Sequence, residues 1–268
     1  MQHLYRTSSD GESLLYAWFS AMHTRVDIAL IAPSPEEQML GIAREIKQEI
    51  HRLETLGNCF DPTSELARVN RLAYTQPQVV SPELYHILHL CKEAYTRTRG
   101  HFDITIHSEA HTPDTIHALC LQADTHTVKF EKPGIRLNLS GFLKGYALDC
   151  IRPMLQKHAI ENALINLGNS SIMALGNQPS GIGWKLEAGI TLHDQCLTTS
   201  GNDTPERRHI INPQTGQPVW GKRQIKVITS QGMWGEICST ALFACPDEWR
   251  PALLESLEGL IWSNSSSL

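Results

Sequence analysis

Residues 197–219, LTTSGNDTPERRHIINPQTGQPV, gather many hydrogen-bonding side chains in one short run. Three hydroxyl residues at 198–200 open the run, and His209 directly follows Arg207 and Arg208. Two neighbouring positive charges disfavour a protonated imidazole, so His209 is expected to be neutral near pH 7. A neutral histidine can accept a proton as a general base. The run therefore predicts a catalytic base at His209, the alternative being a surface histidine ahead of a strand.

A second run, LNLSGFLKGYALD at residues 137–149, combines a turn with the start of a helix. We expect a strand that leads into a turn at Ser140 and Gly141, and then a helix that carries Lys144. A glycine turn lets the backbone approach a phosphate, while the helix N-terminus and the lysine favour negative charge. The run does not match the P-loop pattern G-x-x-x-x-G-K-[ST]. It indicates an anion-binding turn, or else a packing glycine beside a surface lysine.

A third run, WGEICSTALF at residues 234–243, holds oxygen side chains at helical spacing. Glu236, Ser239 and Thr240 stand at i, i+3 and i+4, so a helix would place them on one face. Hard oxygen ligands of this kind suit Mg²⁺. The alternative is an ordinary helix with a capping hydroxyl and a solvated glutamate.

Composition excludes several classes of protein. The chain has 23 Lys and Arg against 28 Asp and Glu, with no basic tract, so nucleic acid is not expected as a partner. Its 7 cysteines are odd in number and form no C-x-x-C pair, which argues against a disulfide scaffold or a four-cysteine zinc site. His101, His107 and His111 likewise fit no standard zinc spacing.

The N-terminal segment lacks the basic start and longer apolar core of a secretory signal. No run of residues approaches the length of a membrane span. We therefore expect a cytoplasmic protein with no membrane span. If an export signal has been removed, the protein is expected to be periplasmic or membrane-anchored.

Three helices are predicted to frame the polar runs. The first spans residues 34–57, where apolar residues recur every three or four positions and Ser34 is the expected N-cap. The second spans residues 81–99, with Ser81 as the expected N-cap and a proline at its first position. The third spans residues 145–158.

Short β-like runs lie between and around these helices. They fall at residues 24–32, 127–131, 136–140, 163–168, 184–191 and 224–230. Helices and strands mix without a regular βαβ repeat, which predicts an α+β fold with a mostly antiparallel sheet. The length of 268 residues, without a linker or an internal repeat, predicts a single domain over residues 1–268.

The order of these runs over residues 21–257 resembles the ApbE family, the Mg²⁺-dependent FAD:protein FMN transferases. Two runs carry the resemblance most specifically. The family's His-Ile-Ile-x-Pro-x-Thr-Gly stands at residues 209–216, and its Lys-Gly-Tyr-Ala-x-Asp stands at residues 144–149. The family's Gly-x-Phe-Asp at residues 100–103 and Thr-Ser-Gly at residues 199–201 add weaker landmarks.

The resemblance implies an ApbE-type α+β fold with packed helices and a flavin cleft between a strand-rich and a helix-rich lobe. It implies Mg²⁺-dependent transfer of FMN from FAD to a threonine of an acceptor flavoprotein, with His209 as the base. The implied flavin contacts are Met22, Phe60, Phe102, Asp103, Asn138, Lys144 and Ile211. The implied metal ligands are the Gly141 carbonyl, Glu236, Ser239 and Thr240.

Several site positions depart from the family's pattern. A family tyrosine is Phe60 here, a family aspartate is Asn138, and another family aspartate is Glu236. His23 and Ser140 stand where the family has glycine. The changes leave three readings: a divergent FMN transferase, an FAD pyrophosphatase that yields FMN and AMP, or a non-catalytic flavin-binding member. The sequence leaves the oligomeric state open.

Overall fold

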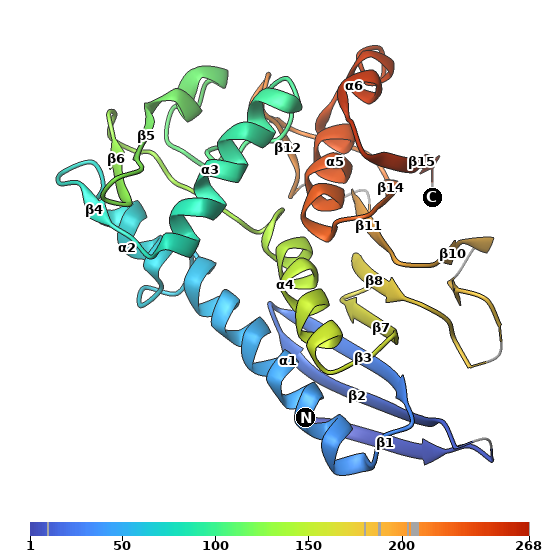
Figure 1. Ribbon diagram of the computed structural model, residues 1–268. Helices are drawn as coiled ribbons and strands as arrows, with labels where there is room; N and C mark the ends of the chain where they lie inside the picture. The colour runs from blue at the N-terminus through green and yellow to red at the C-terminus, as the bar shows by residue number, and fades with distance from the viewer. Residues whose placement is uncertain (10, 180, 187–188, 203, 205–208, 268) are drawn as a thin grey trace.

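A large antiparallel sheet forms the frame of the computed structural model, which describes residues 1–9, 11–179, 181–186, 189–202, 204 and 209–267 (Figure 1). Its order is β1-β2-β3-β7-β8-β11-β14-β15, and every neighbouring pair is antiparallel. The strands are β1 (Gln2–Thr7), β2 (Ser13–Ala21), β3 (Thr24–Ala32), β7 (Asn162–Leu167), β8 (Ser171–Leu175), β11 (Gln195–Asn202), β14 (Arg223–Thr229) and β15 (Leu260–Ser267). The predicted α+β class with an antiparallel sheet is confirmed.

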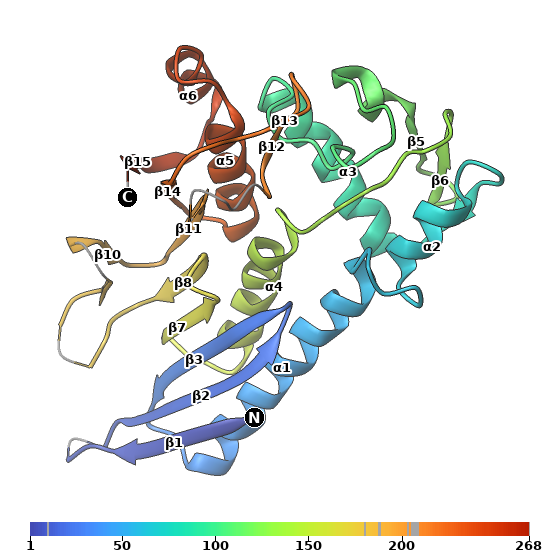
Figure 2. The ribbon, with the colours of Figure 1, turned by 180° about the vertical axis from the view of Figure 1, so that it is seen from behind.

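Three long helices cover one face of this sheet, as the two opposite views show (Figures 1 and 2). They are α1 (Glu36–Gly57), α4 (Leu143–Lys157) and α5 (Gly232–Ala244). Burial alternates along β2, so Leu15, Ala17 and Phe19 face the helices. They pack with Ile46 and Ile50 of α1 in one core cluster. A smaller cluster on the opposite face lies under the hairpin of β9 (Trp184–Lys185) and β10 (Thr191–Leu192).

The remaining elements form a helical lobe beside the sheet. It contains α2 (Glu65–Leu72), α3 (Pro82–Arg97), the 3₁₀ helix η1 (Pro113–Ala118) and a small sheet of β4 (Gln78–Val79), β6 (Thr127–Phe130) and β5 (Leu119–Gln122). The lobe shares one apolar cluster with α5, through residues such as Leu88, Phe142 and Phe243. The short helix α6 (Arg250–Ser256) and the hairpin of β12 (Ile211–Asn212) and β13 (Gln217–Pro218) complete the chain.

Two N-cap residues were predicted, and one of them is right. Ser81 caps α3, since its Oγ accepts a hydrogen bond from Leu84 N at 3.2 Å. Ser34 does not cap α1: the N-cap is Pro35, with no side-chain hydrogen bond, and the Ser34 N–H donates to the Ala32 carbonyl at 2.8 Å. The Ser34 carbonyl accepts from the Tyr5 hydroxyl, so this serine serves the β3-to-α1 turn.

The strand predicted at residues 136–140 is wrong. The backbone there is irregular, ends in a turn at Ser140 and pairs with no strand of the described chain. Asn70 of α2 takes the place of a neighbouring strand, because its side chain bonds the Leu137 N–H at 2.8 Å and the Leu137 carbonyl at 2.9 Å. The Asn138 N–H then donates to the Ile104 carbonyl. The helix that follows begins at Leu143, two residues earlier than the predicted position 145.

Sequence reasoning also left some elements out. Residues 2–7 and 13–21 form β1 and β2, and neither these strands nor α2 and α6 were predicted. The run at residues 184–191 holds two short strands, and two of its positions lie outside the described residues. The 7 cysteines are all free. Among the helices that the structure describes, none has the length and apolar character that a bilayer crossing needs.

Candidate active site

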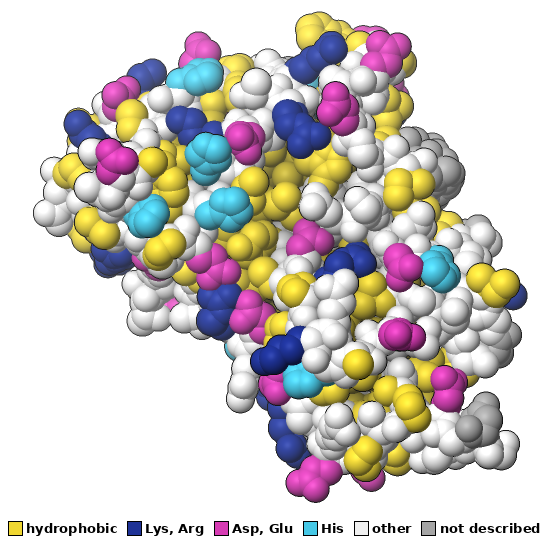
Figure 3. All heavy atoms as spheres, in the orientation of Figure 1, with side chains coloured by type: hydrophobic (Ala, Val, Ile, Leu, Met, Phe, Trp, Pro, Cys, Tyr) yellow, Lys and Arg dark blue, Asp and Glu magenta, His cyan; other side chains and the backbone are white. Residues whose placement is uncertain are grey.

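A cavity of about 620 Å³ lies between the large sheet and the helical lobe. Its walls come from segments far apart in the sequence: the β2–β3 and β7–β8 turns, the end of β11, residues 101–107, the turn before α4, residues 209–213 and one face of α5. The volume is that of a small-molecule site. On the face shown in Figure 3, acidic and basic side chains of the described residues are interspersed rather than separated by sign.

The cavity brings together most of the residues singled out from the sequence. Its lining includes Met22, Phe102, Asp103, Asn138, Gly141, Lys144, His209, Ile211, Glu236 and Thr240. Ser239 lies just beneath the lining, fully buried. Phe60 is outside the lining, 74% exposed on the loop between α1 and α2. Phe60 therefore does not line this cavity, and its contact with flavin stays a prediction.

The turn before α4 is held by its own side chain. Asn138 Oδ1 accepts a hydrogen bond from Ser140 N at 2.8 Å, and Phe142 N donates to the Leu139 carbonyl at 2.9 Å. Among the described residues no side chain caps the N-terminus of α4, so its first turn presents the positive end of the helix dipole there. This turn lies at the cavity, and its binding of an anion stays a prediction.

The run Lys-Gly-Tyr-Ala-x-Asp owes its spacing to the contact between α4 and α5. A methyl group on Gly145 would lie 2.2 Å from the Gly232 carbonyl oxygen, so only glycine fits at this crossing. One turn further on, the Asp149 carboxylate accepts from the N–H groups of Gly232 and Met233, both at 2.8 Å. Burial raises the pKa of Asp149, and these two bonds oppose the rise. Gly145 and Asp149 thus fix the start of α5 against α4.

Lys144 and Glu236 both line the cavity, and with their serine partners they form what we call the cavity floor. Lys144 Nζ donates to Ser170 Oγ, and Ser171 Oγ donates to Glu236 Oε1. Burial raises the pKa of Glu236, while Lys144 and the Ser171 hydrogen bond act in the opposite direction. Sequence reasoning missed both serines. The signal available was the polar pair directly after the turn at Asn169, which has a φ of 59°.

Hydroxyl groups continue this floor toward β11. Ser200 Oγ lies 2.8 Å from Ser239 Oγ and 3.3 Å from Thr240 Oγ1. Gly141 lies beside Thr240, since a methyl group on Gly141 would be 3.5 Å from Thr240 Oγ1. The expected Mg²⁺ ligands thus form one oxygen-rich set around a single anionic side chain, Glu236. Such a donor set fits a magnesium ion that keeps several waters and also binds substrate phosphate.

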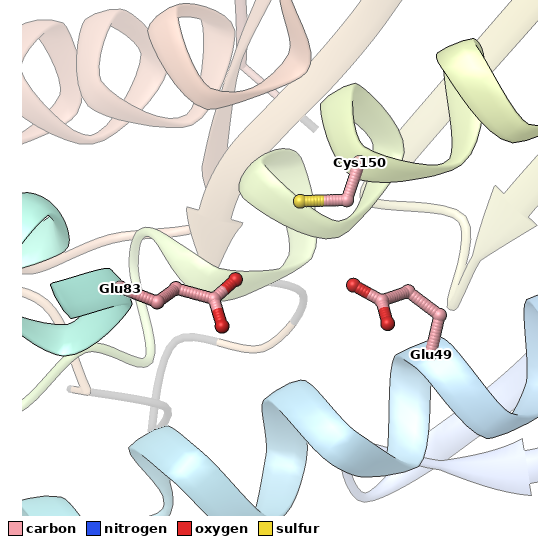
Figure 4. Close-up of side chains that lie close together, drawn as sticks. All are labelled: Glu49, Glu83 and Cys150. Atoms are coloured by element: carbon pink, nitrogen blue, oxygen red, sulfur yellow. The ribbon is translucent and has the colours of Figure 1, made fainter. Parts of the chain in front are cut away.

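A different cluster is the one group of three His, Cys, Asp or Glu side chains in the described chain whose ligand atoms lie within 4.8 Å of one another. Figure 4 shows Glu49 of α1 and Glu83 of α3 with their carboxylates facing each other, and Cys150 of α4 nearby. Arg52 already bonds both carboxylates, at 2.7 Å to Glu49 Oε1 and 2.9 Å to Glu83 Oε1. Burial raises the pKa of the Cys150 thiol to about 12. This cluster therefore joins three helices, and the positive charge of Arg52 already balances its carboxylates in place of a metal ion.

The segment after Gly100 forms another wall of the cavity, and Gly100 itself contacts the hairpin that follows His209. Asp103 accepts hydrogen bonds from Thr105 N at 2.7 Å, Thr105 Oγ1 at 2.6 Å and His111 Nε2 at 2.8 Å. The Asp103 side chain is fully buried, so these partners fix it beneath the wall. His101 is 3% exposed, its Nδ1 has no hydrogen-bond partner among the residues that the structure describes, and burial lowers its pKa.

His209 is exposed at the edge of the cavity, just before β12. The chain then turns at Asn212, whose carbonyl accepts from Gly216 N at 2.8 Å, and returns as β13. Arg207 and Arg208 lie outside the described residues. Their predicted effect on His209 therefore stays a prediction.

Fold and cavity together define an α+β protein with a cavity of small-molecule size between an antiparallel sheet and a helical lobe. The sequence profile of the ApbE family matches residues 22–261. The FAD:protein FMN transferase of Klebsiella pneumoniae is 26% identical over 254 residues, which cover 82% of this chain and 80% of that protein. The Chlamydia muridarum protein of the same name is 28% identical over 209 residues, and the match spans 66% of each chain.

Solved structures agree with this match. The flavin transferase ApbE from Vibrio cholerae superimposes with a TM-score of 0.79 at 19% identity, over 99% of this chain and 98% of that chain. The flavinyl transferase ApbE from Pseudomonas stutzeri gives 0.79 at 17% identity, over 93% and 89%. At these identities the superpositions establish a common fold. The chain belongs to the ApbE family.

Proposed function

We propose that this chain transfers FMN from FAD to a threonine hydroxyl of an acceptor flavoprotein, with Mg²⁺ as the metal. The curated relatives named above are FAD:protein FMN transferases. The observation that carries the proposal is the meeting of Lys144 of α4, Glu236 and Thr240 of α5, and His209 at one cavity, although these three segments lie far apart in the sequence.

The chemistry is a displacement at phosphorus. The acceptor oxygen forms a bond to the FMN phosphorus, the bond from that phosphorus to the bridging oxygen breaks, and AMP leaves. His209 at the cavity edge takes the proton of the attacking hydroxyl. Lys144 and the positive N-terminal end of helix α4 bind the negative pyrophosphate. Phe102 and Ile211 supply apolar surface for the flavin ring.

The oxygen set on the floor would hold the metal. Its members are the Gly141 carbonyl, Glu236, Ser239 and Thr240. When bound, Mg²⁺ would neutralise charge on the phosphate oxygens. Glu236 provides the anionic charge of this set, and the Ser171 hydrogen bond orients its carboxylate.

The test combines the purified protein with FAD and MgCl₂, with and without a protein extract of its own cell. AMP is measured by chromatography, and covalent flavin is detected as fluorescent bands on a denaturing gel. AMP release together with a Mg²⁺-dependent fluorescent band is expected. AMP release without a band would indicate FAD hydrolysis by water. FAD binding without AMP under either condition would contradict the proposal and indicate a flavin-binding protein.

A further inference from the structure

The hairpin that follows His209 forms one wall of the cavity. Ile210, Ile211 and Pro213 line the cavity, and Pro213 is buried. The two strands of the hairpin, β12 and β13, are only two residues long. Ile211 pairs with Pro218, and Asn212 pairs with Gln217. Proline offers no N–H to such a ladder, and a short isolated hairpin is at best marginally stable in water. The position of this wall must therefore depend on contacts at the ends of the hairpin.

The base of the hairpin is fastened to the large sheet. Asn202, at the end of β11, is fully buried, and its Nδ2 donates to the Val219 carbonyl at 2.9 Å and to the Gly221 carbonyl at 3.2 Å. Val219 N donates to the Ile210 carbonyl at 2.9 Å. These bonds hold the two ends of the hairpin beside the strand that carries Thr199 and Ser200.

The tip of the hairpin reaches the opposite wall. Gln214 N donates to Asn212 Oδ1 at 2.8 Å, which shapes the turn. The Gln214 side chain then crosses over, and its Nε2 donates to the Gly100 carbonyl at 3.3 Å. Gly100 directly precedes the wall segment that contains His101, Phe102 and Asp103. One side-chain amide thus joins the two walls of the cavity.

Gly100 is shaped to receive this contact. Its φ is +77°, a conformation that side-chain-bearing residues rarely adopt. A methyl group there would lie 2.7 Å from Gln214 Nε2 and 3.0 Å from the Tyr95 hydroxyl oxygen. Because Gly100 has no side chain, the Gln214 amide can approach the Gly100 backbone closely enough to bond its carbonyl.

We propose that Gln214 is a positioning residue: its amide fastens the hairpin to Gly100 and so holds His209 and the Ile210–Ile211 wall against the bound flavin nucleotide. The assignment of the ligand and of the reaction rests on the proposed function. The fastening itself rests only on the contacts described. Gln214 touches neither the reacting atoms nor the floor of the cavity, so it acts through the hairpin.

The test variant is Gln214→Glu, which keeps the size of the side chain but replaces the N–H donor with an oxygen that faces a carbonyl. Gln217→Glu is the matched control, since it makes the same change at an exposed position of the same hairpin. Gln214→Lys returns an N–H donor of similar reach and is the rescue variant.

The first measurement is independent of activity. Hydrogen exchange of a peptide that covers residues 209–221, followed by mass spectrometry, is expected to be faster in Gln214→Glu than in the parent and in Gln217→Glu. The loss of one hydrogen bond corresponds to a change of about 2- to 10-fold. In the Gln214→Lys variant the exchange rate of this peptide is expected to be close to that of the parent.

The second measurement is FAD release, followed by flavin fluorescence, together with the KM and kcat of AMP formation. We expect Gln214→Glu to release FAD about 2- to 10-fold faster, with kcat falling as well because His209 is held less firmly. Equal exchange in Gln214→Glu and Gln217→Glu would overturn the fastening. A parent that forms no AMP would overturn the proposed function, while the exchange result would still decide on Gln214.

Discussion

The backbones of Gly145 on α4 and Gly232 on α5 touch so closely that neither position has room for a methyl group. An added Cβ would lie 2.2 Å from the Gly232 oxygen at the first position and 2.6 Å from the Gly145 oxygen at the second. Lys144 and Glu236 flank this crossing on the cavity side. The crossing thus places the positive and the negative side chain of the floor within reach of one ligand.

Gly145→Ala is therefore expected to destabilise the protein, because the new methyl group meets backbone that cannot move aside. Overpacking of this kind typically costs about 1–3 kcal/mol or more in the free energy of unfolding. Gly41→Ala is the control, since Gly41 lies in α1 with nothing within 4 Å of an added Cβ. That change is expected to stabilise by about 0.5–1 kcal/mol. Urea unfolding measures both, and a Gly145→Ala variant as stable as the parent would refute the crossing.

The Ser171 hydrogen bond to Glu236 gives a second prediction. Ser171 is fully buried and Glu236 is 4% exposed, so the carboxylate depends on this donor. A hydrogen bond to a charged group contributes about 1.5–3 kcal/mol, and Ser171→Ala is expected to lower the free energy of unfolding by that amount. Ser170→Ala, the neighbouring change at a half-buried serine, is expected to cost less. Chemical denaturation compares the two, and the reverse order would show that Ser171 does not support Glu236.

His101 predicts a pH dependence of stability. Burial lowers the pKa of His101 in the folded protein. Below about pH 6.5 the unfolded chain takes up a proton on this side chain that the folded chain resists. Stability is therefore lost as the pH falls from about 6.5 through the lowered pKa. Melting temperatures at pH 8 and pH 5 should drop less in His101→Leu than in the parent. The same drop in both proteins would show that His101 does not contribute.

The fold could be predicted where local patterns and tertiary structure agree. The helix α3 begins at Ser81-Pro82 because a cap and a proline suit a helix start without any distant partner. The segment at Leu137 could not be predicted, since its backbone is satisfied by Asn70, which lies 67 positions away. The same limit applies to Ser34, which is drawn into a turn by Tyr5.

Much of the cavity could also be predicted, because the ordered motifs mark its lining residue by residue. The motifs do not predict the buried residues that hold the lining side chains in place. Ser170 and Ser171 reach Lys144 and Glu236 through the pairing of β7 with β8, and His111 reaches Asp103 through an irregular loop. Phe60 shows the opposite case. The resemblance implied a flavin contact at this position, but the loop leaves Phe60 exposed outside the lining.

His209 gives the last prediction. It is exposed at the cavity edge, and the hairpin that begins beside it also lines the cavity. Under the proposed function, His209→Ala removes the group that accepts the proton of the attacking hydroxyl. Loss of a general base lowers a rate by about 10²–10⁴-fold, so AMP formation should fall by this factor.

The affinity for FAD should stay near that of the parent, because the base contacts the acceptor hydroxyl rather than the pyrophosphate. An exposed position also allows chemical rescue: added imidazole can diffuse to the space left by the side chain and restore part of the rate. The measurement is AMP formation with saturating FAD and Mg²⁺, with and without imidazole, beside a fluorescence titration of FAD. A variant that matches the rate of the parent would assign the base to another residue. A variant that loses FAD binding as well would assign His209 a role in holding the nucleotide.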